Sequence, residues 1–180
     1  MFAALYNPIS LNTKDDLNKA FSADQRTKYI CGSVIYVEEP ITSVHSDEQT
    51  MTIAEYMWVE AGDNLSAGVP GMIFSGGYQS EAMIGSMDAA TAGQKIAFPT
   101  VNVSAGQFTW VKLSGHITAA ANVNVVSGNF VKVSRGNSNV EQGNTTGTVF
   151  DEEALGKATI STSDGETIIV VNAGRTVKIA

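Results

Sequence analysis

The feature that most constrains the fold of this sequence is a succession of short apolar runs across residues 61–180, separated by glycine-containing turn signals. Short Val- and Thr-rich runs broken by Ser-Gly, Gly-Asn or Asp-Gly are typical of a β-sandwich or barrel. Several runs also alternate, so that Val131 and Val133 share one face while Lys132 and Ser134 share the other. Alternation of this kind indicates strands with one buried face and one face in water.

Upstream of residue 61 the sequence predicts one helix and two strands. Thr13 can cap a helix, acidic residues suit its first turn, and apolar positions at helical spacing extend it over residues 13–28. Residues 29–37 are apolar on both faces, which predicts a central strand. Residues 50–60 are rich in β-branched and aromatic side chains and predict a second strand, although a helix remains an alternative there.

The first twelve residues carry apolar side chains without a regular period, namely Phe2, Leu5, Tyr6 and Ile9. Such a segment is either an arm that docks on another molecule or an edge strand of its own domain. We therefore expect a mostly β protein: a small antiparallel β-barrel or sandwich with an N-terminal arm and one short helix. Residues 1–60 would hold the arm, the helix and the first strands, and residues 61–180 the barrel or sandwich.

One internal echo appears within the predicted β domain. Val-Asn-Val followed by a Gly turn and an aromatic residue occurs at 101–108 and again at 123–130, and each copy leads into Val-Lys-hydrophobic-Ser. Each copy predicts a strand, a turn and a strand, and hence two successive hairpins. The alternative is a chance recurrence of common strand and turn residues.

Charge and cysteine content exclude several classes of protein. The net charge of −7 disfavours binding to nucleic acid or to an anionic membrane surface. The single Cys31 excludes an internal disulfide and a Cys-based zinc site. Neither a signal peptide nor an apolar run long enough to span a bilayer is recognisable, so we expect a soluble protein made in the cytosol, with no cofactor.

Catalytic motifs are incomplete in this sequence. A nucleophile elbow around Ser104 lacks its first glycine, because Asn102 stands there. A phosphate-binding loop ending in Gly156-Lys157 lacks the Ser or Thr that should follow. The sequence therefore predicts neither nucleophilic catalysis at this serine nor nucleotide binding at this loop.

The ionisable side chains do not form a recognisable site either. His45 lies in a polar stretch that suggests a solvated loop more than a metal site, and His116 follows a glycine at a predicted turn. Glu38 and Glu39 are neighbours on a strand and should point to opposite faces. The acidic run at 151–153 lacks calcium-ligand spacing. We expect no catalytic residue, no metal site and no enzymatic activity.

The order of the predicted strands resembles that of a known group of phage proteins. The segment Gly-Gln-Phe-Thr-Trp-Val at 106–111 is followed by a Gly turn, an Ala/Val-rich segment, a second strand, a Gly/Thr loop and the strand at 155–158. This order resembles that of tailed-phage capsid decoration (cement) proteins, over about residues 61–180. Residues 67–74 look like the first barrel strand of such proteins, and the final strand-turn-strand would fall at 166–179.

The resemblance implies a structural virion protein on the outer capsid surface that forms homotrimers and braces capsomer junctions. Its partners would be the major capsid protein and further copies of itself, with the arm residues Phe2, Leu5, Tyr6 and Ile9 gripping the shell or a neighbouring subunit. The alternative is a tail-fibre or spike module that binds a host-surface glycan. Exposure of Tyr78 or Trp110 in a groove would favour glycan binding, whereas burial of Trp110 would favour decoration.

Overall fold

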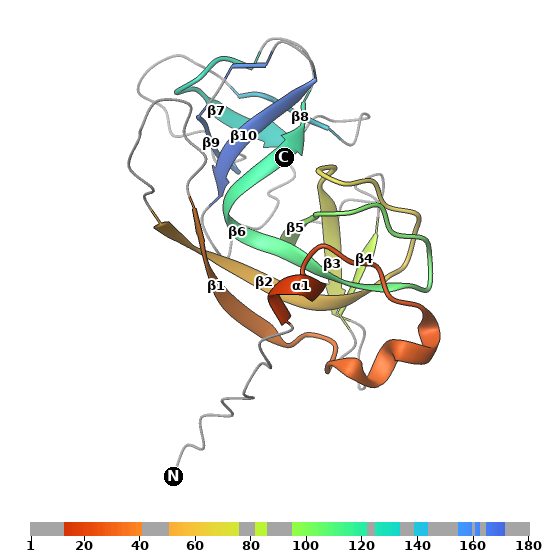
Figure 1. The fold of residues 1–180 in the computed structure, drawn as a ribbon. Coiled ribbons are helices and arrows are strands. Elements are labelled where there is room, and N and C mark those ends of the chain that lie inside the picture. Colours follow the sequence, from red (N-terminus) through yellow and green to blue (C-terminus); the bar gives the residue numbers. More distant parts are fainter. Residues whose placement is uncertain are drawn as a thin grey trace.

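The computed structural model describes residues 13–40, 51–75, 82–85, 95–121, 125–133, 139–143, 155–159, 161–162 and 165–171. The fold is mostly β, as the alternating runs predict (Figure 1). The helical elements are α1 (Thr13–Asp16) and the 3-10 helix η1 (Ala23–Lys28). The strands are β1 (Val34–Pro40), β2 (Met51–Ala61), β3 (Gly71–Ser75), β4 (Ala82–Gly85), β5 (Lys95–Pro99), β6 (Phe108–Ala120), β7 (Phe130–Val133), β8 (Val140–Gln142), β9 (Gly156–Ala158) and β10 (Glu166–Val171).

Five strands close into a small barrel. The pairings run β2–β4–β3–β5–β6 and return to β2, and all are antiparallel except β2–β4. Strand β1 extends this barrel as a ribbon by pairing with β2. Because a ring has no free edge among its members, the strands of the barrel satisfy one another's backbone hydrogen bonds.

The long strand β6 belongs to two sheets. Its first part pairs with β2 and β5, and its second part, from Gly115 to Ala120, pairs with β10. From there a second antiparallel sheet runs β10–β9–β7–β8, and Figure 1 shows it stacked at one end of the barrel. The molecule thus combines the barrel and the sandwich that the sequence left as alternatives.

Alternation along the strands divides the buried side chains into three clusters. The barrel interior contains every second residue of its wall, including Val59, Ile73, Ala97 and Val111. The outer face of β3 and β5 packs against the second sheet through a mostly aliphatic cluster that includes Phe98 and Val131. The outer face of β2 and β6 carries the third cluster, which is aromatic and includes the following side chains: Tyr56, Trp58, Phe108 and Trp110.

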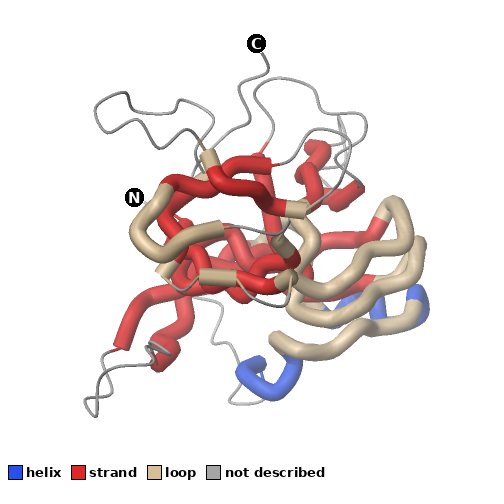
Figure 2. The backbone as a smooth tube through the Cα atoms, turned by 90° about the horizontal axis from the view of Figure 1, so that it is seen from above, coloured by secondary structure: helices blue, strands red, loops and turns tan. Residues whose placement is uncertain are grey.

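The N-terminal segment 16–37, which we call the N-terminal cover, buries this aromatic cluster. Leu17 and Phe21 pack on it, and the ring of Tyr29 lies edge-on to Trp58 and Trp110 with centroids 4.9 and 5.0 Å apart. Figure 2, viewed from above, shows both helical segments at the periphery of the strands. The helical elements therefore cover the barrel rather than build it.

The helix expected over residues 13–28 is shorter than predicted. Only one α-helical turn forms in α1, and η1 follows after an extended stretch. The interruption lies at Phe21, whose backbone N–H and carbonyl both bond to Phe108 at 2.8 Å. Phe21 thus bonds to the first residue of β6 while its ring enters the aromatic cluster, and these long-range contacts outweigh the helical spacing.

The strand expected at residues 29–37 also differs in place and extent. Residues 29–33 form a turn in which Gly32 has φ of +82°, and β1 begins only at Val34. Among the described strands β1 pairs only with β2, so it is an edge strand and not a central one. Its apolar second face was misleading because Val34 and Tyr36 point to solvent.

The strand expected at residues 50–60 is confirmed as β2, and the helical alternative is excluded. The boundary expected between residues 60 and 61 falls at the end of this strand. Strand β2 pairs with β6 from Glu55 to Glu60, so residues on both sides of that boundary contribute to the barrel.

The two copies of the internal echo form the same turn. Gln107 N–H donates to the Ser104 carbonyl at 3.0 Å, and Asn129 N–H donates to the Val126 carbonyl at 3.1 Å. The third residue of each turn is a glycine with φ of +80° or +86°, as a type II turn requires. The prediction of two hairpins is nevertheless wrong, because β6 pairs with β2, β5 and β10, and β7 with β8 and β9.

Candidate functional site

Several residues singled out from the sequence lie outside the described residues. These are the arm positions Phe2, Leu5, Tyr6 and Ile9, together with His45, Tyr78 and the acidic run at 151–153. Trp110 is described and is 1% exposed. It lies on the outer wall of the barrel beneath the N-terminal cover, so it offers no platform for a ligand.

A pocket of about 490 Å³ opens beside β6, where the strand passes from the barrel to the second sheet. A register shift between Glu55 and Tyr56 marks a β-bulge at this point, and Gly115 of β6 has φ of +100°. A Cβ on Gly115 would lie 3.0 Å from the Cβ of Ala54, so only glycine lets the two strands approach here. Bulges bend strands and re-aim side chains, which is how this pocket is formed.

One wall of the pocket is the loop before β3. Gly68 N–H donates to the Pro99 carbonyl at 2.8 Å, and its own carbonyl accepts from Ala120 N–H at 2.9 Å. A Cβ on Gly68 would lie 3.0 Å from the Thr118 carbonyl oxygen, and φ is +74° there. This glycine therefore lets the loop lie directly on β6. The full lining is Asn18, Glu39, Tyr56, Ala67, Gly68, Phe98, Pro99, Thr100, Lys112, His116, Ile117, Thr118 and Ala120.

A cluster of polar side chains from three strands lies at the pocket. The Lys112 ammonium group of β6 forms an ion pair with the Glu39 carboxylate of β1, and the Tyr56 hydroxyl of β2 donates to the same carboxylate. Lys112 and Tyr56 are buried, and burial together with the hydrogen bond to Glu39 raises the pKa of Tyr56 far above its usual range. The cluster thus holds one positive and one negative charge in contact with each other.

His116 lies four positions beyond Lys112 on β6 and is half-buried. Burial and the nearby Lys112 charge lower its pKa, so the imidazole is neutral at pH 7. Among the described residues its Nδ1 atom has no hydrogen-bond partner, although the atom is buried. The sequence placed His116 at a turn, and this prediction is wrong, because Gly115 lies within a strand.

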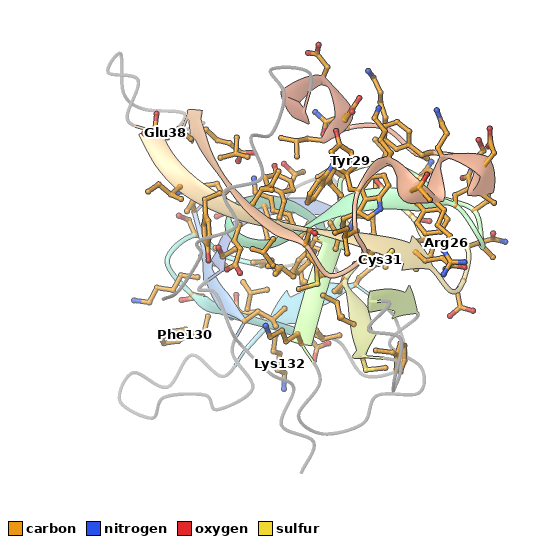
Figure 3. All side chains as sticks on the ribbon, turned by 90° about the horizontal axis from the view of Figure 1, so that it is seen from below. Arg26, Tyr29, Cys31, Glu38, Phe130 and Lys132 are labelled. Carbon is orange, nitrogen blue, oxygen red and sulfur yellow. The ribbon has the colours of Figure 1, made fainter. Side chains whose placement is uncertain are left out.

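Glu39 behaves as the strand alternation predicted. It points to Tyr56 and Lys112, while its neighbour Glu38 is exposed on the opposite face of β1. In Figure 3 Glu38 lies at the far end of the ribbon from Cys31 and Arg26. The sequence did not indicate that Glu39 would meet Lys112, since the two are 73 positions apart.

A second candidate surface is the exposed face of the β1–β2 ribbon, which we call the apolar strip. Val34, Tyr36 and Ile53 are 37%, 71% and 63% exposed. The register pairs Tyr36 with Glu55 and Ile53 with Glu38, so the three apolar side chains share one face of the ribbon with these two carboxylates. Large apolar side chains gathered on one face mark a surface that contacts another molecule more often than a scatter of single residues does.

Metal-binding clusters and membrane-spanning helices are absent from the described part of the chain. No group of three or more His, Cys, Asp or Glu side chains is placed there to hold a metal ion. None of its helices has the length and apolarity needed to cross a bilayer. Cys31 is a free thiol, and burial and the Glu60 carboxylate raise its pKa.

One sequence signal for the pocket was present but was misinterpreted. An isolated glycine inside a strand pattern often marks a bulge or a close backbone approach, and Gly115 interrupts such a pattern. Interpreted as a bulge, it would have indicated where β6 bends. Glu39, Tyr56 and Lys112 meet at the bend, but no sequence pattern around them indicates that contact.

No family model matches this sequence, and no curated protein matches it. Among solved structures, the fold is similar to that of the N base of the head fiber gp8.5 in bacteriophage phi29. The two are 15% identical with a TM-score of 0.47, and the match covers 69% of this chain and 98% of that one. This is a partial similarity of fold.

Proposed function

We propose that this chain is a non-enzymatic structural protein of a virion, a decoration protein that binds the outer surface of a tailed-phage capsid and braces its capsomer junctions. The observation that carries the proposal is where the large apolar side chains lie. Trp110 and Trp58 are buried in the core, at 1% and 0% exposure. Tyr36 and Ile53 are exposed on the apolar strip. Burial of Trp110 favours decoration over a glycan platform, and the strip supplies a contact surface.

The polar cluster supports the non-enzymatic part of the proposal. Both oxygens of the Glu39 carboxylate accept hydrogen bonds, one from Tyr56 and one from Lys112. A carboxylate whose two oxygens are both bonded to protein side chains serves to join β1, β2 and β6, which is a structural role. The raised pKa of Tyr56 likewise keeps its hydroxyl protonated.

The mode of attachment that we propose uses two parts of the chain. The arm residues Phe2, Leu5, Tyr6 and Ile9 grip the major capsid protein or a neighbouring copy, and the apolar strip packs against the same shell. In a homotrimer each contact is made three times, so contacts that are weak singly hold the molecule on the shell together.

Mixing the protein with undecorated capsids and imaging them by cryo-electron microscopy tests the proposal. We expect hundreds of copies per particle, loss of occupancy when residues 1–10 are deleted, and reduced occupancy with Tyr36→Ser combined with Ile53→Ser. Lys157→Ser, an exposed position on β9, is the matched control and should bind as the unaltered chain does. A handful of copies per particle, or no binding by the unaltered chain, would contradict decoration.

A further inference from the structure

The pocket beside β6 has the dimensions of a ligand site. Its volume of about 490 Å³ lies within the range of roughly 300–1,000 Å³ found for small-molecule sites. Side chains or backbone from β1, β2, β5, β6, the loop before β3 and the N-terminal cover all border it. Walls drawn from so many separate segments make a site that forms only in the folded protein.

The charges on the described lining cancel. Glu39 and Lys112 are in contact with each other, and the lining also contains the imidazole of His116. Its pKa is lowered, so it adds no charge at neutral pH. A pocket with balanced charge has no net attraction for a phosphate or another strongly ionised ligand, whose desolvation would go uncompensated.

The remaining groups suit a ligand that both donates and accepts hydrogen bonds. The Lys112 ammonium group has three N–H donors, and Asn18 and Thr118 are exposed at the rim. The Thr100 hydroxyl donates to the Leu17 carbonyl at 2.8 Å, which leaves its oxygen lone pairs to accept. Ala67 and Ala120, which are exposed and half-buried, add a small apolar surface for C–H groups.

An extended peptide is a poorer match for this pocket. Peptides that lie along a sheet need a strand with an unpaired edge. At Val111 and Lys112, β6 is already paired with β2 on one edge and with β5 on the other, and toward Ala120 its edges are occupied by β10 and by the Gly68 loop. A compact ligand that carries its own hydroxyl groups fits better.

We infer that the pocket beside β6 binds a neutral polyhydroxylated ligand, namely one uncharged sugar unit of a glycan. The Lys112 ammonium group and the Asn18 and Thr118 side chains bind its hydroxyls, and Ala67 and Ala120 lie against its C–H face. This binding goes beyond the proposed capsid function and does not depend on it, because Glu39 and Tyr56 border the pocket on one face of the β1–β2 ribbon and the apolar strip lies on its other face.

Titration of the full chain with uncharged sugars, followed by amide NMR, tests the inference. The panel contains glucose, galactose, mannose, N-acetylglucosamine, lactose and maltose, with inorganic phosphate and tetra-alanine as comparison ligands. We expect at least one sugar to shift the amide signals of Gly68, Thr100 and Thr118 with a dissociation constant on the order of 1 mM. Thr118→Trp, which fills the pocket, should weaken binding about tenfold or more, whereas Thr27→Trp on exposed η1 should not.

Asn18→Ala provides a second, milder variant in case Thr118→Trp alters the fold. It should weaken sugar binding severalfold, with Gln25→Ala as its exposed control. The inference is overturned if no sugar shifts these amides at about 100 mM. It is equally overturned if only phosphate or the peptide shifts them, or if the shifts persist unchanged in both pocket variants.

Discussion

The barrel wall is covered on two outer faces, and the two covers are built in different ways. The second sheet covers β3 and β5 with short strands and a mostly aliphatic cluster that also contains Phe98 and Met72. The N-terminal cover joins η1 and the start of β1 by irregular stretches and packs large rings, with Phe21 and Tyr29 lying on Trp58 at centroid distances of 5.4 and 4.9 Å. In Figure 3 the labelled residues Arg26 and Tyr29 lie on one side of the view, and Phe130 of the second sheet lies on the other.

The difference follows from how each cover satisfies its backbone. The second sheet bonds to itself and to β6 through regular ladders. The N-terminal cover is instead held by separate anchors: the Thr109 hydroxyl donates to the Lys19 carbonyl at 2.9 Å, and the Thr100 hydroxyl donates to that of Leu17. An irregular segment thus stays ordered when individual side chains replace the ladder.

One carboxylate holds the N-terminal cover together. Asp16 is buried, and its Oδ2 atom accepts from Lys28 Nζ at 2.7 Å and from Tyr29 Oη at 2.8 Å. Burial opposes its ionisation, but the bonds from Lys28 and Tyr29 outweigh this and hold the pKa of Asp16 below its usual value. This residue therefore links α1 to the end of η1.

The largest effect that we predict is the loss of a ring from the aromatic cluster. Trp110→Ala should lower the free energy of unfolding by about 3–5 kcal/mol, because it removes a fully buried ring from between β6 and the N-terminal cover. Urea unfolding followed by circular dichroism measures the change. Val126→Ala, at a 49% exposed position before β7, is the control and should change it by less than about 0.5 kcal/mol. A loss under about 1 kcal/mol for Trp110→Ala would show that the cluster does not hold the cover.

Removal of the charge on Asp16 should weaken one cover and leave the other intact. Asp16→Asn should cost about 1–2 kcal/mol, with loss of protection from hydrogen exchange confined to the N-terminal cover. The folded pKa of Asp16 lies below 3.8, so its contribution is complete above that value and is lost as the pH falls through the folded pKa. Unfolding measured between pH 2 and 7 should therefore show a smaller acid-induced loss in the variant. Asp15→Asn, at an exposed neighbour, should retain the acid-induced loss of the unaltered chain.

The smallest effect concerns the turn that the barrel and the second sheet share. Gly106→Ala and Gly128→Ala each force a left-handed residue to carry a Cβ, which costs about 1 kcal/mol. A Cβ at either glycine would meet nothing within 4 Å, so conformational strain alone should set the loss and make it equal in the two variants. Thermal unfolding of both variants measures it, and asparagine at each position should cost less than alanine. Unequal losses would mean that the two turns are held differently.

Local chemistry allowed much of the fold to be predicted from the sequence. Strands β2 and β7 and the two glycine turns were indicated by residues close together in the chain, whereas β6 is buried on both faces from Phe108 to Gly115 and does not alternate there. The helix over residues 13–28 and the central strand at 29–37 were wrong for one reason. In both places the side chains fit a local period, but contacts with Phe108, Trp58 and Trp110 decided the backbone.

By itself the sequence determined the β class and the two glycine turns at 104–107 and 126–129, because these depend on neighbours in the chain. Only the tertiary structure decided which strands pair, how the ring closes, and that Glu39, Tyr56, Lys112 and His116 border one pocket. The physical reason is that strand partners are selected by burial of whole faces across long loops. A residue's own neighbours in the sequence carry no information about that selection.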